Sequence, residues 1–308
     1  MFKEILEIYQ LLEDPKIDGN IVAEFFKSKG AEDICVKRVE GSHGYTDVIK
    51  IKVKGKNGKS NGGSAPTLGI IGMLGGIATV PRFRGLVSDA DGAIAALAVA
   101  LKLIKMEKMG EVLEGDVIVS THICPKAPTI PHDPVPFVGS PVEVPKLVRE
   151  LVDEEMDAIL SIDTTRGNRV INVKGFAITP TVKEGWILRV SEDLLTIMEQ
   201  VTGKLPAVVP ITMQDITPYG NGVYHLNSMM QPSTVTKAPV VGVAITSEVP
   251  IPGSATGVND IVSMEQAARF CLEVAKYFGE GRVEFYDKND FERLVELYGS
   301  MSKLQQSR

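Results

Sequence analysis

Residues 90–121 read ADGAIAALAVALKLIKMEKMGEVLEGDVIVST, a long alanine-rich pattern followed by a short β-branched run. Apolar residues at helical spacing predict a helix over 90–110, and the apolar run at 116–121 predicts a buried strand. A second strand-like run, TLGIIGML at 67–74, precedes this helix. Two strands that flank a helix predict a right-handed βαβ crossover, and therefore parallel pairing of the strands.

The same alternation of helices and strands continues as far as residue 279. Further helices are expected at 145–156, 192–203 and 263–279, and further strands at 158–163, 186–190, 207–212 and 240–246. Short strands between amphipathic helices are typical of a parallel sheet that is covered on both faces. The sequence therefore predicts an α/β fold, a three-layer α/β/α sandwich with a mainly parallel sheet.

Helical patterns also occur near both ends of the chain. Residues 1–30 contain two predicted helices, and residues 288–305 contain another amphipathic helix. We expect one domain over residues 1–308, with these helices packed on its outside. The last helix is also a candidate for self-association, so a homo-oligomer is an expected state. The glycine-rich segment at 54–66 indicates an exposed, flexible loop that is either a connector or a mobile lid.

The composition restricts the class of protein and its partners. The chain has 308 residues, enough to bury a core without disulfides, and a formal net charge of −6. That charge argues against a nucleic-acid or membrane surface, so we expect a small molecule or another protein as partner. Cys35, Cys124 and Cys271 are odd in number, which favours reduced thiols in a cytoplasmic protein. The first residues lack a signal-peptide pattern, and the longest apolar run, 93–101, is shorter than the ~18 residues of a membrane span.

Polar residues follow the predicted strands at their carboxyl ends. In open α/β sheets ligands bind at this edge, because the loops that leave parallel strands meet there. Asp89 and Asp91 stand at the start of the alanine-rich helix. The residues that follow the strands are Gly75, Gly76, Thr121, His122, Cys124, Asp163, Thr164, Thr165, Arg166, Ser247 and Glu248. Acids and a histidine from distant parts of the chain therefore converge, as a metal-assisted or acid–base site requires.

Carboxylates and histidines at this edge are the candidate metal ligands. The predicted ligand set for zinc or another divalent metal is Asp89, His122, Asp163 and His132. Each has a structural alternative. Asp89 would cap a helix, Asp163 would form an Asx turn, and each histidine would serve only the local structure.

The loop HICPKAPTIPHDP at 122–134 combines reactive side chains with four prolines. His122, Cys124 and Asp133 are the candidate catalytic residues, because histidine, thiol and carboxyl groups perform acid–base or nucleophilic chemistry. The prolines bias the residues before them toward extended conformations, which makes the loop a stiff arm. Such an arm presents His132 and Asp133 to the edge, or it is a purely structural loop.

Arginines flank the candidate acids. Arg84 precedes Asp89, and Arg166 and Arg169 follow Asp163. These three arginines are the predicted ligand-binding residues, because a guanidinium group binds a carboxylate through paired hydrogen bonds. They favour a small anionic substrate or ligand. The alternative is that these arginines are solvated surface residues without a ligand.

Motifs for two common enzyme classes are absent from the sequence. The glycines of GIIGMLGG at 69–76 lack the G-x-G-x-x-G spacing, and no P-loop lysine follows them, so no nucleotide cofactor is expected. A G-x-S-x-G elbow, the signature of common serine hydrolases, does not occur either.

Four segments occur in order between Thr67 and Phe278: GLVSDADGAIAALAVALKLI, LEGDVIVSTH, AILSIDTTRGN and VPIPGSATGVNDIVSMEQAARF. This order resembles the zinc exopeptidase superfamily of aminopeptidases and deacylases. The resemblance implies an α/β/α domain with a two-metal site at the carboxyl edge, with Asp89 as the bridging aspartate and Asp163 as a later acidic ligand. At the positions of the family's remaining ligands, near 72–74, 121–123 and 253–256, this chain has other residues.

A further resemblance covers nearly the whole chain. It rests on the segments APTLGIIGMLGG, GLVSDADGA, DVIVSTHICPKAPT, DAILSIDTTRGNRVI, QDITPYGNGVYHLNS and APVVGVAIT. They look like the bacterial and archaeal family named domain of unknown function 1177. The resemblance implies that these segments belong to a single unit.

Two functions remain as hypotheses. The first is a metal-dependent hydrolase of an amide or peptide bond, with a rearranged ligand set and a small anionic substrate. The second is a non-catalytic, exopeptidase-like protein that binds a small anionic ligand, such as an amino acid or a short peptide. One scaffold can host either function.

Overall fold

The protein is described by a computed structural model, which covers residues 1–14, 16–73, 75–77, 79–80, 86–131, 136–165, 167–211, 228–251 and 258–305. Within these ranges no helix combines the length and the apolar content that crossing a membrane requires.

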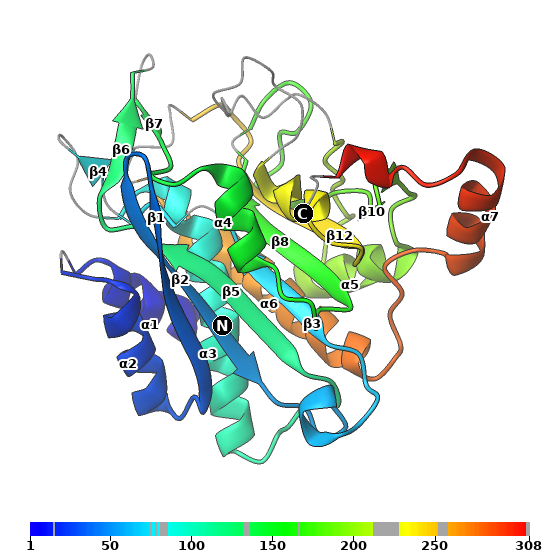
Figure 1. Ribbon diagram of the computed structural model, residues 1–308, viewed down its shortest axis with the longest axis horizontal. Helices are drawn as coiled ribbons and strands as arrows, with labels where there is room; N and C mark the ends of the chain where they lie inside the picture. The colour runs from blue at the N-terminus through cyan, green and yellow to red at the C-terminus, as the bar shows by residue number, and fades with distance from the viewer. Residues whose placement is uncertain are drawn as a thin grey trace.

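A mixed sheet of nine strands forms the centre of the described structure (Figure 1). Its order is β1 (Asp33–Gly41), β2 (Gly44–Val53), β5 (Val117–Ile123), β3 (Leu68–Gly72), β8 (Ala158–Thr164), β12 (Val240–Thr246), β10 (Val182–Lys183) and β11 (Trp186–Ile187), with β9 (Gly175–Ile178) paired to β12. The central strands β5, β3, β8 and β12 are parallel, and the outer strands pair antiparallel. The predicted α/β fold is confirmed, and its parallel part is the centre that the βαβ pattern indicated.

Helices cover both faces of this sheet and complete the three layers (Figure 1). The helices α1 (Phe2–Leu12), α3 (Asp91–Lys108), α5 (Glu192–Thr202) and α6 (Ile261–Gly279) pack with one another on one face, and α2 (Gly19–Lys29) packs near the β1–β2 edge. The opposite face carries α4 (Val144–Leu151) and the 3₁₀ helix η3 (Ser228–Thr234). One apolar core lies on each side of the sheet, because the fully buried strands present apolar side chains to both faces.

Smaller elements lie outside this sandwich. A second sheet contains β4 (Thr79–Val80), β6 (Ala127–Ile130) and β7 (Phe137–Val138), so part of the proline-rich arm is a strand. The remaining 3₁₀ helices are η1 (Lys59–Asn61), η2 (Ser88–Ala90) and η4 (Ser302–Leu304). The last helix, α7 (Lys288–Tyr298), has no buried residue and lies at the rim of the molecule in Figure 1. The single-domain organisation stays a prediction.

Two predicted strands are shorter than expected. Of the run predicted at 207–212, the described residues 207–211 pair with the sheet only through an isolated bridge between Val208 and Ile178. Pro206 and Pro210 flank this bridge and have no N–H to donate, which explains why the pairing does not extend. The strand expected at 186–190 is reduced to β11.

The glycine-rich segment at 54–66 is held in place by a buried carboxylate. Asp116 accepts hydrogen bonds from the backbone N–H groups of Gly55 (2.8 Å) and Ser60 (2.9 Å), which holds the pKa of its carboxyl below the usual range against the opposing effect of burial. The segment connects β2 to β3 at the amino end of β3, opposite the proposed site. The segment therefore does not cover the carboxyl edge, which favours the connector interpretation, and the lid interpretation stays a prediction.

Close packing of α3 against the strands brings its acidic start to the carboxyl edge. A Cβ atom on Gly92 would lie 2.5 Å from the carbonyl oxygen of Ile162 and 2.8 Å from that of Met73. A Cβ atom on Gly72 would lie 2.7 Å from the carbonyl oxygen of Gly92. Only glycine allows the helix and the ends of β3 and β8 to approach this closely.

The variant Gly92→Ala tests this contact. The added methyl group would meet two backbone oxygens that cannot rotate away, so we expect the free energy of unfolding to fall by about 1–3 kcal/mol despite the better helix propensity of alanine. Urea unfolding measures the change, and Glu107→Ala at an exposed position of the same helix is the control. Equal stability of Gly92→Ala and the parent would show that α3 can move away from the sheet.

Candidate functional site at the carboxyl edge

Asp163 lies near the end of β8 and is fully buried. Its Oδ1 accepts a hydrogen bond from the backbone N–H of Thr164 at 2.7 Å, and its Oδ2 accepts one from the hydroxyl of Ser228. Ser228 begins η3, so the carboxylate joins the sheet to the layer above it. An Asx turn would use the N–H of Thr165, which donates to the Ile245 carbonyl instead, so the structure does not show the turn role that was one alternative for Asp163.

Three buried hydroxyl groups lie on the same face of the sheet as this carboxylate. Ser161 and Thr165 are two residues before and after Asp163, and side chains alternate along a strand, so all three point to one side. Thr246 on β12 lies beside Thr165, because Ala244 pairs with Asp163 and the Thr165 N–H donates to the Ile245 carbonyl at 2.8 Å. The hydroxyls of Ser161, Thr165 and Thr246 have no hydrogen-bond partner within the part of the chain that the structure describes. We call Asp163, Thr165, Ser228 and Thr246 the Asp163 cluster.

A second acidic group lies at the start of α3. Asp91 is buried, and its Oδ1 accepts a hydrogen bond from Asn259 Nδ2 at 2.5 Å, while the same amide donates to the Val87 carbonyl at 3.0 Å. Asp89 is 6% exposed and belongs to η2, and the N-cap of α3 is Ala90 without a side-chain cap bond. The N-cap interpretation of Asp89 is therefore wrong. The Thr164 hydroxyl donates to the Ser88 carbonyl at 3.1 Å and so links η2 to the end of β8.

His122 is 3% exposed, and the protein occupies both of its ring nitrogens. The backbone N–H of Gly75 donates to Nε2 at 2.8 Å, and Nδ1 lies 2.9 Å from the hydroxyl of Thr46. That hydroxyl donates to the Ile123 carbonyl at 3.1 Å, so Nδ1–H is assigned as the donor to Thr46. Burial lowers the pKa of His122 to about 4.

This network changes the role assigned to His122. A metal ligand needs a free lone pair, and the only lone pair of the neutral ring accepts the Gly75 N–H. A general base needs the same lone pair. The structural alternative therefore fits His122, and we leave this residue out of the proposed metal and catalytic sites.

Cys124 is also unsuited to the catalytic role expected of it. The residue is 1% exposed, and burial raises the pKa of its thiol to about 11. The nucleophile in thiol chemistry is the thiolate, which this environment disfavours at neutral pH. Cys124 is a buried core residue at the point where β5 ends.

The other predicted site residues divide into two groups. Arg169 is exposed and lies beyond the end of β8. His132, Asp133, Arg84 and Arg166 lie outside the described residues, so their predicted roles stay predictions. Among the residues that the structure covers, no group of three or more histidine, cysteine or acidic residues could hold a metal ion. Both nitrogens of His122 are hydrogen-bonded, and Cys124 is buried with a raised thiol pKa. The described side chains therefore do not fit a zinc site.

Sequence reasoning missed Ser228, Thr246 and Asn259 as members of the edge. Thr246 is the last residue of a predicted strand, which was a usable signal. Ser228 and Asn259 are reached through loops of irregular sequence, and nothing in their neighbourhood indicates which strand they approach.

One family model matches most of this chain. The family described as Protein of unknown function (DUF1177) matches residues 37–308. A search of curated proteins finds no match.

Solved structures share the fold of this protein. LapA aminopeptidase of Legionella pneumophila superposes with a TM-score of 0.52 at 11% identity, over 93% of this chain and 72% of its own. Cytosol aminopeptidase of Coxiella burnetii gives 0.50 at 14% identity, over 92% and 70%. Glutaminyl cyclase of an Acidobacteriales bacterium gives 0.50 at 10% identity, over 91% and 94%. At these identities the likeness shows the fold alone, and the expected exopeptidase-like fold is confirmed.

The buried neutral state of His122 predicts a dependence of stability on pH. The pKa of the folded state, about 4, lies below the ordinary value of 6.5, so the unfolded chain takes up the proton first as the pH falls. The stability that His122 contributes is full above pH 6.5 and is lost between pH 6.5 and about 4, by ~3 kcal/mol in all. In urea unfolding, we expect the stability difference between the parent and His122→Gln to shrink from pH 7 to pH 5. The exposed His43→Gln is the control, and parallel pH profiles for parent and His122→Gln would contradict the prediction.

The cysteines should differ in reactivity because they differ in burial. Cys35 is exposed, whereas Cys124 and Cys271 are buried and their thiol pKa values are raised. With Ellman's reagent on the native protein at pH 8, we expect one thiol to react quickly, and Cys35→Ser to abolish this phase. Peptide mass spectrometry identifies the modified residue. Labelling of Cys124 at the rate of Cys35 would show that the end of β5 opens.

Proposed function

We propose, on the premise that this chain belongs to the family Protein of unknown function (DUF1177) and has the fold of the aminopeptidases above, that it binds a free amino acid or the amino end of a short peptide. The site is the carboxyl edge of the sheet, at the Asp163 cluster. The observation that carries this proposal is the pair of buried hydroxyls, Thr165 and Thr246, which have no partner within the described residues and share a face of the sheet with a buried carboxylate.

Buried polar groups without partners are costly, and few persist without a reason. Leaving a buried hydroxyl unsatisfied costs about 1–3 kcal/mol. Thr165 is 5% exposed and Thr246 is 1% exposed, so both hydroxyls are removed from bulk water. A ligand with polar groups at this place would satisfy both hydroxyls and so offset this cost.

The charge of the cluster favours a ligand with an ammonium group. The Asp163 carboxylate accepts hydrogen bonds from Thr164 and Ser228, and a buried carboxylate gains most from donors that carry a positive charge. An ammonium group offers three N–H donors, which suit a carboxylate and two hydroxyls together. The amino end of an amino acid has this chemistry.

The carboxylate of an amino acid would require a cation at the same edge. Arg169 follows β8 and is exposed, so it is a candidate for this role. Arg84 and Arg166 are predicted for the same role from the sequence, and they lie outside the described residues. A ligand held at both ends is a small zwitterion, which refines the expectation of an anionic ligand.

A metal-dependent amide or peptide hydrolase is the second candidate function. It is favoured by Asp89 and Asp163, which stand where the zinc exopeptidase resemblance has a bridging and a later acidic ligand. Carboxylates suit hard divalent cations as well as zinc. This candidate ranks second because both ring nitrogens of His122 already have hydrogen-bond partners and so cannot bind a metal. A cytoplasmic location and a homo-oligomeric state stay predictions.

Binding measurements on Asp163 variants separate these functions. In isothermal titration calorimetry against leucine, glutamate and a set of dipeptides, we expect at least one ligand to bind. Asp163→Asn should weaken that ligand about tenfold, because it removes a charge-assisted hydrogen bond. Asp33→Asn, at an exposed position of β1, is the control. The N-acetyl derivative of the ligand lacks the ammonium group and should bind about tenfold more weakly as well.

Two outcomes would decide against amino-acid binding. Equal affinity for the ligand and its N-acetyl derivative would show that Asp163 does not recognise an ammonium group. Elemental analysis that finds about one equivalent of a divalent metal in the parent, lost in both Asp89→Asn and Asp163→Asn with intact circular dichroism, would establish the second candidate instead.

A further inference from the structure

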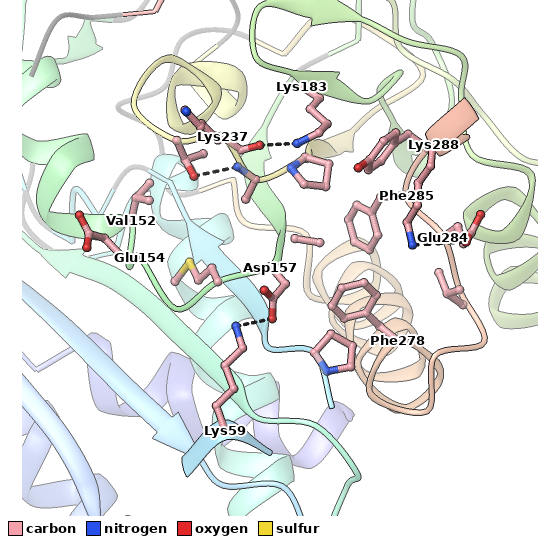
Figure 2. A pocket seen from close by; sticks show the side chains of 18 of the residues that line it. Lys59, Val152, Glu154, Asp157, Lys183, Lys237, Phe278, Glu284, Phe285 and Lys288 are labelled. Carbon is pink, nitrogen blue, oxygen red and sulfur yellow. Dashed lines mark hydrogen bonds and ion pairs between the residues drawn. The ribbon is translucent and has the colours of Figure 1, made fainter. Parts of the chain in front are cut away.

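An open cavity of about 990 Å³ lies at the amino ends of the parallel strands (Figure 2). Its wall includes Pro66 before β3, Asp157 before β8 and Pro239 before β12. The end of α6 and the connection from α6 to α7 close the other side, with Phe278 and residues 283–286. We call this cavity the amino-edge pocket. Its size falls in the range of pockets that hold small molecules.

The amino-edge pocket is separate from the Asp163 cluster. Strand β8 has seven residues and runs from Ala158 in the pocket to Thr164 at the other edge, a length of roughly 20 Å at ~3.3 Å per residue. The zinc exopeptidase resemblance assigns all its ligands to the carboxyl edge. Neither that resemblance nor the proposed function explains the amino-edge pocket.

Basic side chains outnumber acidic ones around the pocket, although the whole chain carries a net charge of −6. The basic residues of the wall are Lys59, Arg149, Lys183, Lys237 and Lys288, and the acidic residues are Glu154, Asp157 and Glu284. A concave surface of one predominant sign concentrates the field that it produces. With five basic and three acidic residues, the wall of the pocket carries a formal charge of +2, which favours an anionic ligand over a cationic one.

Three of the lysines flank the ring-lined part of the pocket and keep capacity for a further bond. Lys59 lies 2.6 Å from Asp157 and donates to the Glu155 carbonyl at 3.1 Å. Lys183 donates to the Lys237 carbonyl at 2.8 Å (Figure 2) and lies 3.3 Å from Glu184. Lys288 is 3.9 Å from Glu284, a long and exposed ion pair of little energetic value. An ammonium group has three donors, so none of these contacts saturates its lysine.

Aromatic rings form the apolar wall between these lysines. Phe278 and Phe285 lie edge to face with their ring centres 5.3 Å apart, and Figure 2 shows both rings beside the cavity. Phe285 is 2% exposed, whereas Phe278 is only partly buried. A third ring that packs against this pair would gain both apolar burial and favourable aromatic geometry.

We propose that the amino-edge pocket binds a small organic anion that carries an aromatic ring, an aryl carboxylate or an aryl phosphate. The ring packs against Phe278 and Phe285, and the anionic group lies among Lys59, Lys183 and Lys288. This site is independent of the function proposed for the carboxyl edge.

Ligand-observed NMR titrations test the ligand class. The probes are phenyl phosphate, phenylacetate, inorganic phosphate and benzyl alcohol, each at millimolar concentration. We expect at least one aryl anion to bind, and inorganic phosphate and benzyl alcohol to bind about tenfold more weakly, because each offers only half of the contacts. The comparison of phenyl phosphate with phenylacetate identifies the anionic group. No binding of either aryl anion, or equal binding of inorganic phosphate, would overturn the proposal.

Variants of the wall test the location. The double variant Lys59→Gln/Lys288→Gln should weaken the aryl anion about tenfold, and Lys3→Gln on α1 should leave the affinity unchanged. Phe278→Leu removes the ring at a partly buried position and should weaken the aryl anion while leaving inorganic phosphate unaffected. Circular dichroism verifies that each variant is folded. Unchanged affinity in the double variant would overturn the assignment of the site.

Discussion

The contact between α3 and the ends of β3 and β8 is the constraint on which the carboxyl edge depends. Gly72 and Gly92 meet without side chains between them, so the first turn of the helix lies directly against the strand ends. Asp89 and Asp91 are buried there as a consequence, beside the residues that follow β8. A helix held at the usual distance would leave these acids in solvent, where the sheet could not orient them.

His122 and Asp163 differ in the hydrogen bonds that their side chains make with the surrounding residues. Both residues lie near the carboxyl ends of their strands, β5 and β8, which flank β3. The N–H of Gly75 and the hydroxyl of Thr46 use both nitrogens of His122, so the imidazole connects β5 to β2 and to the segment that follows β3. Asp163 accepts hydrogen bonds from Thr164 and Ser228, and it lies on the same face of the sheet as the hydroxyls of Thr165 and Thr246, which lack partners in the described structure. Two satisfied nitrogens fit a structural role for His122, whereas the unsatisfied hydroxyls on the face of Asp163 are the basis of the ligand site that we propose.

The two edges of the parallel sheet have opposite chemical character. The carboxyl edge gathers buried aspartates and hydroxyls, and the amino edge gathers lysines and aromatic rings around an open cavity. The length of β8 separates the two proposed sites. Under these proposals, ligands of different charge would occupy the two edges without direct contact. A single fold can support two binding functions in this way.

The periodicity of the sequence by itself determined the α/β class, the order of the central elements and the edge where polar residues gather, because strand and helix patterns and the burial of parallel strands are local properties. Tertiary packing decided which side chains meet at each edge and whether they keep free hydrogen-bonding groups. Whether His122 has a free lone pair depends on the position of Gly75 and Thr46, which are 47 and 76 residues away in sequence. Ser228, Thr246 and the lysines of the amino-edge pocket also come together only through long-range contacts. Their roles follow from which groups the fold brings within hydrogen-bonding distance, and no local pattern encodes that distance.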